Sequence, residues 1–335
     1  MLEHGGSGAA YGETGLVDTV PPFLNEAAAP VPRLRIGLLN NMPDTALVQT
    51  ERQFRRLIGP EVELRFFSLA SVPRGPLARA HLDRFYAPHT ALPTAGLDAL
   101  VITGSEPKAA RLDAEPYYAD FTAVVDWAAQ ATTSTLFSCL AAHAAVLHLD
   151  GIERRPLPAK HSGVYPCAAS QPHPLLSGMA PVMPVPHSRW NDLPEGELAA
   201  KGYTVLRRSE AVGVDLFVRE GASLMVFLQG HPEYEIDTLA REYRRDIGRF
   251  LEGSRDTCPG IPENYYSDDA IERLETFVEL ARIKRALSLH ADFPDMAATP
   301  PRPAAWQDGA ARLFRNWLSL VAANRALRAT AEAVA

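Results

Sequence analysis

The sequence lacks the features that mark several broad classes of protein. It has only three cysteines in 335 residues (Cys139, Cys167 and Cys258), which excludes a disulfide framework and favours a reducing cytosol. No stretch approaches the roughly 18 consecutive apolar residues that a membrane-spanning helix needs. The first residues carry neither a basic nor an apolar leader segment, so no secretory signal is expected. A cytoplasmic location is the resulting prediction.

The chain also lacks an excess of positive charge. Its 33 basic residues are outnumbered by 40 acidic ones, which gives a net charge of −7. A general nucleic-acid binder or an acidic-membrane binder would need a basic face, so neither kind of partner is expected. The remaining balance, 47% hydrophobic and 22% charged residues, is that of an ordinary globular protein. Small-molecule partners are the expectation that follows.

Periodic segments alternate between two patterns along the middle of the chain. Residues 1–33 are rich in Gly, Ala and Pro and predict a flexible arm. Short apolar runs, the pattern of buried parallel strands, then occur at 34–40, 62–69, 97–104, 135–140, 202–207, 214–219 and 223–229. Helical spacing occurs at 50–58, 117–131, the segment directly after 140, and 237–251. This alternation predicts an α/β fold with a mostly parallel sheet and helices on both faces.

The segment from residue 252 onward has a different pattern. It contains helical spacing at 268–289, a Pro-rich break at 294–303 and an amphipathic stretch from about 310. We therefore predict an α/β catalytic domain at 34–251 and a C-terminal helical extension at 252–335, packed on that domain. Ligands of parallel sheets bind at the carboxyl ends of the strands, so residues that directly follow strands are the candidates for function.

Cys139 is the first such candidate. It ends the strand at 135–140 and precedes a run of small residues, Ala141-Ala142. A sharp strand-to-helix turn there would expose the thiol and place backbone N–H groups beneath it. Such groups lower a thiol's pKa and stabilise an oxyanion. The alternative is a buried structural cysteine, because free cysteine is often buried.

His231 and Glu233 are the second candidate. They follow the strand at 223–229, again at a carboxyl end, with Pro232 between them. A thiol nucleophile needs a base, and the base needs an orienting carboxylate. Each feature alone could be a solvated loop, but Cys139 together with His231 and Glu233 predicts a Cys–His–Glu triad.

The spacing of cysteine, histidine and glycine residues predicts neither a metal site nor a nucleotide site. Cys167 and Cys258 have no CxxC or Cys/His pattern around them, so no zinc site is predicted. Neither GxGxxG nor GxxxxGK[ST] occurs. No cofactor is expected.

The sequence around these three residues resembles the homoserine O-acyltransferase family of the succinyltransferase type. That family has a class I glutamine amidotransferase-like (flavodoxin-like) fold. The matching pieces occur in family order over roughly 34–320: LLNNMPDTALVQTERQF, LDALVITGSEP, TSTLFSCLAAHAAV, KHSGVY, PHSRW, GHPEYEIDTLAREYRRD and WQDGAARLFRNWL. The set is specific, although no single piece would be.

This resemblance implies a reaction and a set of binding residues. An acyl-CoA co-substrate would acylate Cys139, and the hydroxyl of homoserine or a related amino acid such as serine would then attack the thioester. His231 would be the general base, oriented by Glu233. Lys160, Ser188 and Arg245 would hold the acceptor, and an Arg fork suits an α-carboxylate. The family also implies a role in methionine- or cysteine-type biosynthesis and a homodimer as a candidate assembly.

The chain departs from the family pattern at the site. The family's lysine pair after Met-Pro is replaced by Asp44-Thr45, and the bulky aromatic that follows the nucleophile is Leu140. Lys108 takes the position that chooses between acetyl and succinyl donors, and its charge favours succinyl-CoA. A glutamine amidotransferase-like thiol hydrolase is the alternative, although Cys139 lacks the glycines and glutamine of that elbow motif. A non-catalytic protein on the same fold would be expected to lack a triad member.

Proline is enriched in one internal segment. Nine of the 28 prolines fall within 156–194, the segment that also carries Lys160 and Ser188. Since proline fixes φ and reduces the entropy lost on ordering a loop, we predict that this segment is a stiffened wall of the acceptor site.

Overall fold

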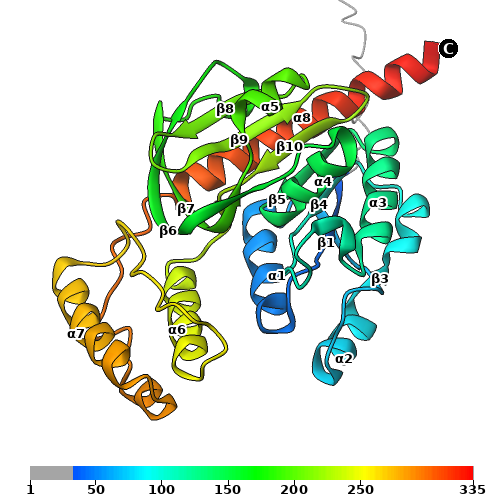
Figure 1. The fold of residues 1–335 in the computed structure, drawn as a ribbon. Helices are drawn as coiled ribbons and strands as arrows, with labels where there is room; N and C mark the ends of the chain where they lie inside the picture. The colour runs from blue at the N-terminus through cyan, green and yellow to red at the C-terminus, as the bar shows by residue number, and fades with distance from the viewer. Residues whose placement is uncertain (1–32, 335) are drawn as a thin grey trace, which may run out of the picture. The chain divides into compact units, whose positions relative to one another are not determined.

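A twisted sheet organises the chain in the computed structural model, which describes residues 33–334 (Figure 1). The arm predicted for residues 1–33 lies, except for Arg33, outside the described residues. Within the described part of the chain, ten strands form one sheet in the order β3-β2-β1-β4-β5-β10-β9-β8-β6-β7. The strands are β1 (Arg35–Leu39), β2 (Glu63–Ser68), β3 (Ala87–Pro88), β4 (Ala99–Ile102), β5 (Ser134–Ser138), β6 (Arg155–Ala169), β7 (Val182–Asp192), β8 (Thr204–Ser209), β9 (Gly213–Arg219) and β10 (Leu224–Leu228). The stretch from β3 to β10 is parallel, and the pairs from β10 to β7 are antiparallel.

Helices connect the strands and cover the sheet. They are α1 (Asp44–Ile58), α2 (Pro76–Phe85), α3 (Tyr118–Ala131), α4 (Leu140–Asp150), α5 (Glu195–Ala200), α6 (Thr238–Leu251), α7 (Asp268–Lys284) and α8 (Gln307–Val334). Short 3₁₀ turns lie at His89–Thr94, Leu112–Ala114, Pro174–Leu176 and Leu287–Asp292. None of the helices within residues 33–334 is both long and apolar enough to cross a membrane.

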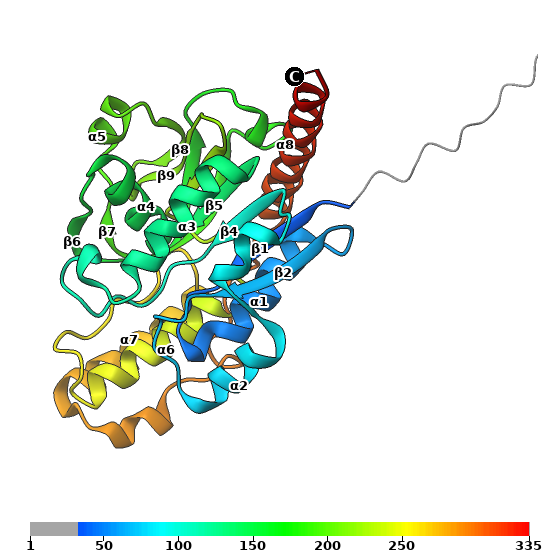
Figure 2. The same cartoon turned by 90° about the vertical axis from the view of Figure 1, so that its right-hand side faces the viewer.

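The side-chain alternation of the strands divides the apolar core between the two faces of the sheet. On β4, Leu100 and Ile102 pack with α3 and α4, whereas Ala99 and Val101 pack with α1 and α8. Successive residues of a strand point to opposite faces, so fully apolar strands need helices on both sides. Figure 2 shows α3 and α4 in front of the sheet and α8 on the other side. The predicted α/β architecture with helices on both faces is confirmed.

Residues after 251 do not form one separate layer. Helix α7 packs against α6 in a third apolar cluster that includes Tyr243, Tyr265 and Phe277. Helix α8 instead returns to the sheet, where Phe314 and Trp317 join the core on the α1 face. From Arg33 onward the chain forms one compact unit. The domain boundary placed at residue 252 stays a prediction.

The Pro-rich segment 156–194 is the largest departure from the predicted elements. The sequence analysis names no strand there, but β6 and β7 form a long antiparallel ribbon across most of it. Proline lacks an N–H and is therefore confined to edges and bulges of sheets. Strand β7 is the edge strand, and the pairing shifts register between Pro156 and His161. The edge position of β7 explains why Pro184 and Pro186 are tolerated within a strand.

Two helix boundaries also differ. The helix predicted at 268–289 ends at Lys284, because Arg285 adopts a left-handed conformation (φ 35°) that stops the helical hydrogen bonding. The helix predicted from about residue 310 begins at Gln307. The fold otherwise places the carboxyl ends of β4, β5 and β10 side by side, which is where the candidate residues lie.

Candidate functional site

Cys139 occupies a strained turn between β5 and α4. Its φ of 50° lies in the left-handed region, which a residue with a Cβ adopts at a cost of about 1–3 kcal/mol. The turn is fixed because the Cys139 N–H donates to the Leu228 carbonyl of β10 at 2.7 Å, and the Ala142 N–H donates to the Cys139 carbonyl at 2.9 Å. The thiol is partly exposed and lies at the N-terminus of α4. This is the strand-to-helix elbow that the sequence predicts.

The loop after β4 packs closely against this elbow. A Cβ added to Gly104 would lie 3.0 Å from the Leu140 nitrogen and 2.7 Å from the Leu140 Cβ, so only glycine allows this approach. The Leu140 N–H has no acceptor among the described residues. It is therefore available to stabilise an oxyanion beside the thiol.

His231 and Glu233 lie directly opposite, after β10. The two side chains are buried, and His231 Nδ1 lies 2.8 Å from Glu233 Oε1. The Ser138 hydroxyl donates to the same Glu233 oxygen at 3.4 Å, while Glu233 Oε2 has no partner among the described residues. The His231 N–H donates to the Pro186 carbonyl at 2.7 Å, which fixes the loop to β7.

Electrostatics favour a charged imidazole facing the thiol. Burial alone would lower the pKa of His231, but the neighbouring Cys139 sulfur and the Glu233 carboxylate raise it well above its usual range. The Tyr234 ring stacks on the His231 ring with a centroid separation of 4.3 Å. The arrangement therefore places an imidazole that readily holds a proton beside the thiol, which is what a cysteine nucleophile needs of its base.

A cavity of about 440 Å³ opens beside this group, which is within the usual size range of small-molecule sites. Cys139, His231 and Glu233 line it together with the loops after β1 and β4, one face of α6, and residues of β6 and β7. The structure thus brings residues that are about 90 positions apart in the sequence into one pocket.

The three residues expected to bind the acceptor line the same pocket. Lys160 of β6 pairs with Asp246 at 2.9 Å, and Ser188 of β7 donates a hydrogen bond to Glu242. Arg245 of α6 contacts Asp246 Oδ1 through Nε (3.2 Å) and Nη2 (3.1 Å).

Both carboxylates remain ionised beside these cations. Burial would raise the pKa values of Glu242 and Asp246, but Lys160 and Arg245 lower both. The pocket therefore offers fixed negative and positive charges close together, which suits a zwitterionic ligand.

Lys108 is not brought into this group. Its side chain is exposed, and its backbone N–H donates to Glu115 Oε1 at 2.6 Å. The residues of that loop that line the pocket are Thr103, Gly104, Ser105 and Glu106. The role of Lys108 in donor choice stays a prediction.

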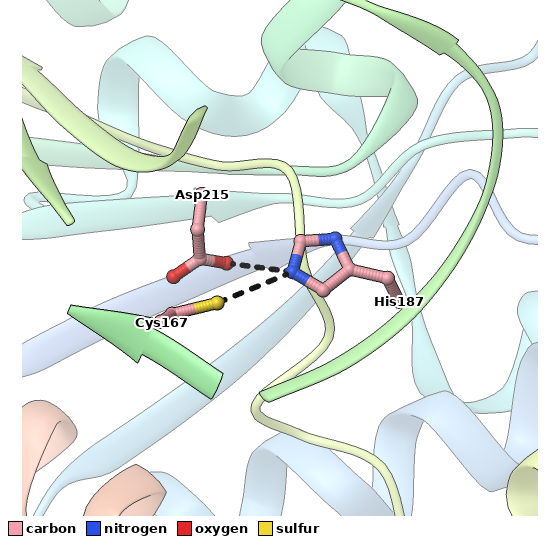
Figure 3. Close-up of side chains that lie close together, drawn as sticks. All are labelled: Cys167, His187 and Asp215. Carbon is pink, nitrogen blue, oxygen red and sulfur yellow. Dashed lines mark hydrogen bonds and ion pairs between the residues drawn. The ribbon is translucent and has the colours of Figure 1, made fainter. Parts of the chain in front are cut away.

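A second cluster of reactive residue types is buried beneath the His231 loop. Cys167 Sγ lies 3.8 Å from His187 Nε2, which lies 3.3 Å from Asp215 Oδ1 (Figure 3). The sequence analysis found no Cys/His pattern around Cys167, because the partners come from β7 and β9. Only knowledge of which strands are neighbours would have revealed them.

The surroundings of this cluster disfavour a metal ion. Arg207 donates to the other Asp215 oxygen, and Arg189 Nε donates to His187 Nδ1 at 3.4 Å. Burial also raises the pKa of Cys167, which keeps the sulfur protonated and a poor ligand. A Cβ at Gly230 would lie 2.5 Å from Asp215 Oδ1, so the cluster packs tightly under the residue that precedes His231.

Comparison with known proteins assigns the chain to a family. The family model described as homoserine O-succinyltransferase matches residues 25–327. The chain belongs to the homoserine O-succinyltransferase family. It is by family an acyltransferase, and the resemblance inferred from the sequence motifs is confirmed.

Curated relatives in the homoserine O-succinyltransferase family cover nearly the whole chain. A homoserine O-succinyltransferase of Methylorubrum extorquens is 72% identical over 297 residues, 89% of this chain and 90% of that protein. The Rhodopseudomonas palustris protein of the same name is 48% identical, over 85% of this chain and 87% of that protein. The corresponding Bradyrhizobium japonicum protein is 45% identical, over 86% of this chain and 90% of that protein.

Solved structures with related architecture are more distant from this family member. A glutamine amidotransferase from Thermotoga maritima has 13% identity and a TM-score of 0.49, covering 87% of this chain and 99% of that chain. One from Methylobacillus flagellatus has 15% identity and a TM-score of 0.48, covering 86% and 94%. No residue role is transferred from them.

Several pocket residues were missed by the sequence analysis. They are Glu106, Trp190, Tyr234, Glu242, Asp246, Arg249 and Arg255. The spacing of Glu242, Arg245 and Arg249 places them on one face of a helix, a signal that was available once Arg245 was singled out. Trp190 and Arg255, which meet in a cation–π contact at 4.8 Å, carry no such signal.

Proposed function

We propose that the protein is an acyl-CoA-dependent O-acyltransferase that transfers a succinyl group to the hydroxyl of homoserine through a thioester on Cys139. The observation that carries the proposal is a strained, partly exposed cysteine facing a buried His–Glu pair in one pocket. The names of the relatives support succinyl as the acyl group and homoserine as the acceptor. The donor, the thioester and a place in methionine-type biosynthesis are parts of this proposal.

In the first half-reaction, His231 takes the thiol proton of Cys139 and the sulfur attacks the thioester carbonyl of the acyl-CoA. The tetrahedral oxyanion accepts a hydrogen bond from the Leu140 N–H. As the carbon–sulfur bond to CoA breaks, the imidazolium gives its proton to the departing CoA sulfur. The acyl group then remains on Cys139.

In the second half-reaction, His231 removes the proton from the acceptor hydroxyl, whose oxygen attacks the acyl carbon. The tetrahedral intermediate collapses, the O-acyl product leaves, and the proton returns to the Cys139 sulfur. Glu233 holds the ring through its Oε1 at 2.8 Å and stabilises the positive charge in both halves.

The acceptor would lie along α6. Arg245 presents a planar fork to the α-carboxylate, with Lys160 as a second cation. The buried Glu242 carboxylate is placed to take the α-ammonium group, and its hydrogen bond from Ser188 fixes its orientation. An acceptor with both charges would satisfy the pocket better than a simple alcohol.

The thioester is tested by mass spectrometry of the protein after incubation with succinyl-CoA and no acceptor. We expect the mass to increase by one succinyl group, and homoserine to remove the adduct while O-succinylhomoserine forms with ping-pong kinetics. The Cys139→Ala variant should form no adduct, whereas the matched Cys258→Ala variant should form it normally. The His231→Gln variant should lower kcat about 100-fold or more.

An absent adduct during turnover would contradict the mechanism. A matrix of acyl-CoA donors against homoserine and serine separates the acceptors, because a preference for serine would replace homoserine in the proposal. A glutaminase assay tests the thiol-hydrolase alternative, and release of ammonia from glutamine that depends on Cys139 would support that alternative instead.

A further inference from the structure

An ion pair spans the mouth of the pocket. Arg249 Nη1, in the last turn of α6, lies 2.8 Å from Glu106 Oε1, in the loop that follows β4. Both residues line the cavity that contains Cys139. The pair therefore connects the helix that carries Arg245 to the loop beside the nucleophile.

The loop that Arg249 reaches lies on the nucleophile side of the pocket. Glu106 comes two residues after Gly104, whose backbone is packed against the Leu140 nitrogen. The guanidinium of Arg249 therefore lines the same cavity as Cys139 and is paired with the loop that packs against the nucleophile's turn. None of the other pocket cations is paired with this loop in residues 33–334.

The charges around α6 leave room for a second anion. Four cations surround the buried carboxylate of Asp246 at 2.9 to 4.0 Å: Lys160, Arg245, Arg249 and Arg255. The carboxylates of Asp246, Glu242 and Glu106 offset three of these four positive charges. A zwitterionic acceptor adds no net charge, so an excess of one positive charge remains for an anionic donor.

Arg249 is the cation whose partner is most easily exchanged. Its side chain is 38% exposed and that of Glu106 is 45% exposed, so water screens their attraction. Lys160, at 11% exposed, is instead held against the buried Asp246. A carboxylate that arrives in the pocket can replace Glu106 on Arg249 without leaving a buried charge unpaired.

From this arrangement we infer that Arg249 selects acyl donors that carry a distal carboxylate, by exchanging its ion pair with Glu106 for one with the donor. The inference rests on the proposed acyl transfer to Cys139. It assigns to Arg249 the function that the sequence analysis expected of Lys108, whose side chain is exposed and does not line the pocket. The ligand class is a dicarboxylic acyl thioester such as succinyl-CoA.

The experiment compares kcat/KM for succinyl-CoA and acetyl-CoA at saturating homoserine. In Arg249→Met, we expect the value for succinyl-CoA to fall about 10- to 100-fold, the effect of losing one charge-assisted hydrogen bond, while acetyl-CoA changes less than about threefold. Arg249→Lys should retain part of the preference for succinyl-CoA. Arg241→Met is the matched control, because Arg241 lies on the same helix, is exposed and pairs with Asp237 outside the pocket.

Two further variants separate the alternatives. Glu106→Gln should keep or increase the preference for succinyl-CoA, since it removes the carboxylate that competes with the donor for Arg249. If the variant instead loses this preference as Arg249→Met does, the proposed exchange of ion pairs is wrong. Lys108→Ala should leave the preference for succinyl-CoA unchanged. If that preference is lost in Lys108→Ala but kept in Arg249→Met, then Lys108 is the selector and the inference is wrong.

An equal loss of kcat/KM for both donors in Arg249→Met, or a wild-type preference for acetyl-CoA, would overturn the inference while acyl transfer stands. Wild-type protein that forms no acyl adduct with any acyl-CoA would overturn both.

Discussion

At the scale of single residues, the site is built from groups held against their ordinary preferences. Cys139 adopts a positive φ, and Glu233 keeps one buried oxygen without a partner among the described residues. Such features persist only where the surroundings determine the geometry, and they concentrate at functional sites. Here the surroundings are the hydrogen bonds from Cys139 to β10 and from the His231 loop to β7.

His143 provides a pH test of this buried environment. Burial first, and then the nearby Arg189 and Arg154, lower its pKa to about 3. Below about pH 6.5 the His143 imidazole binds a proton in the unfolded chain but not in the folded chain, so unfolding takes up a proton. The free energy of unfolding should fall as the pH drops from 6.5 toward 3, by up to about 1.4 kcal/mol per pH unit from this group.

Urea unfolding at several pH values between 7 and 4 measures this slope. In His143→Gln, whose amide can still donate to the Gln229 oxygen that lies 2.9 Å from His143 Nε2, the slope should decrease by about one proton. All other titrating groups are shared by the two proteins, so the difference isolates His143. Parallel curves would contradict the prediction.

The grouping of Cys139, His231 and Glu233 in one pocket could be predicted from the sequence because these residues come just after the ends of two strands. A parallel sheet brings such positions to one edge whatever the rest of the fold does. The selection of Glu242, Asp246 and Arg249 depends on which face of α6 meets the pocket, and this is set by packing with α7. The Cys167–His187–Asp215 cluster depends on strand order in the antiparallel half, which no local pattern encodes.

At the scale of elements, two segments carry the site in different ways. The β6–β7 ribbon presents Lys160 and Ser188 and holds the His231 loop through the Pro186 carbonyl. The sequence suggested a stiff segment here but not strands, because proline is a poor strand former unless the strand is at an edge. Edge position is a property of the assembled sheet, so it could not be predicted from this segment alone.

Helix α8 closes the other face of the sheet through Trp317. The side chain is 1% exposed, its Nε1 donates to the Ser134 hydroxyl at 2.9 Å, and its ring meets Phe314 edge to face. Replacing Trp317 by alanine should lower the free energy of unfolding by about 3–5 kcal/mol, because it leaves a cavity in the core. Urea denaturation measures the change.

Leu327→Ala on the same helix is the matched control. Leu327 is 69% exposed, so this variant should stay within about 0.5 kcal/mol of the wild type. A loss below about 1 kcal/mol in Trp317→Ala would mean that α8 contributes little to the core, contrary to its contacts.

At the scale of the whole molecule, the charge of the site opposes the charge of the chain. The net charge is −7, yet along α6 the pocket gathers four cations, Lys160, Arg245, Arg249 and Arg255, against three carboxylates, Glu106, Glu242 and Asp246. A local excess of positive charge on an acidic protein attracts anions to that place while the rest of the surface repels them. This pattern suits a polyanionic donor such as acyl-CoA.

Ionic strength tests this view. Raising the salt from about 0.05 to 0.5 M shortens the screening length to a few ångströms, so long-range attraction is lost. The KM for succinyl-CoA should increase several-fold, whereas the KM for the zwitterionic homoserine should change little. Equal shifts for the two substrates, measured in the same assay, would argue against electrostatic attraction of the donor.

The position of α8 in the chain has a consequence for synthesis on the ribosome. Ile36, Leu38, Val101 and Val226 form the sheet face that α8 covers, and all of them are translated before residue 307. Until α8 emerges, the nascent chain must carry that apolar face bare or shielded by a chaperone. A messenger RNA truncated before this helix would therefore yield an aggregation-prone polypeptide that is a target for chaperones and proteases. This holds even though the truncated polypeptide would contain every proposed catalytic residue.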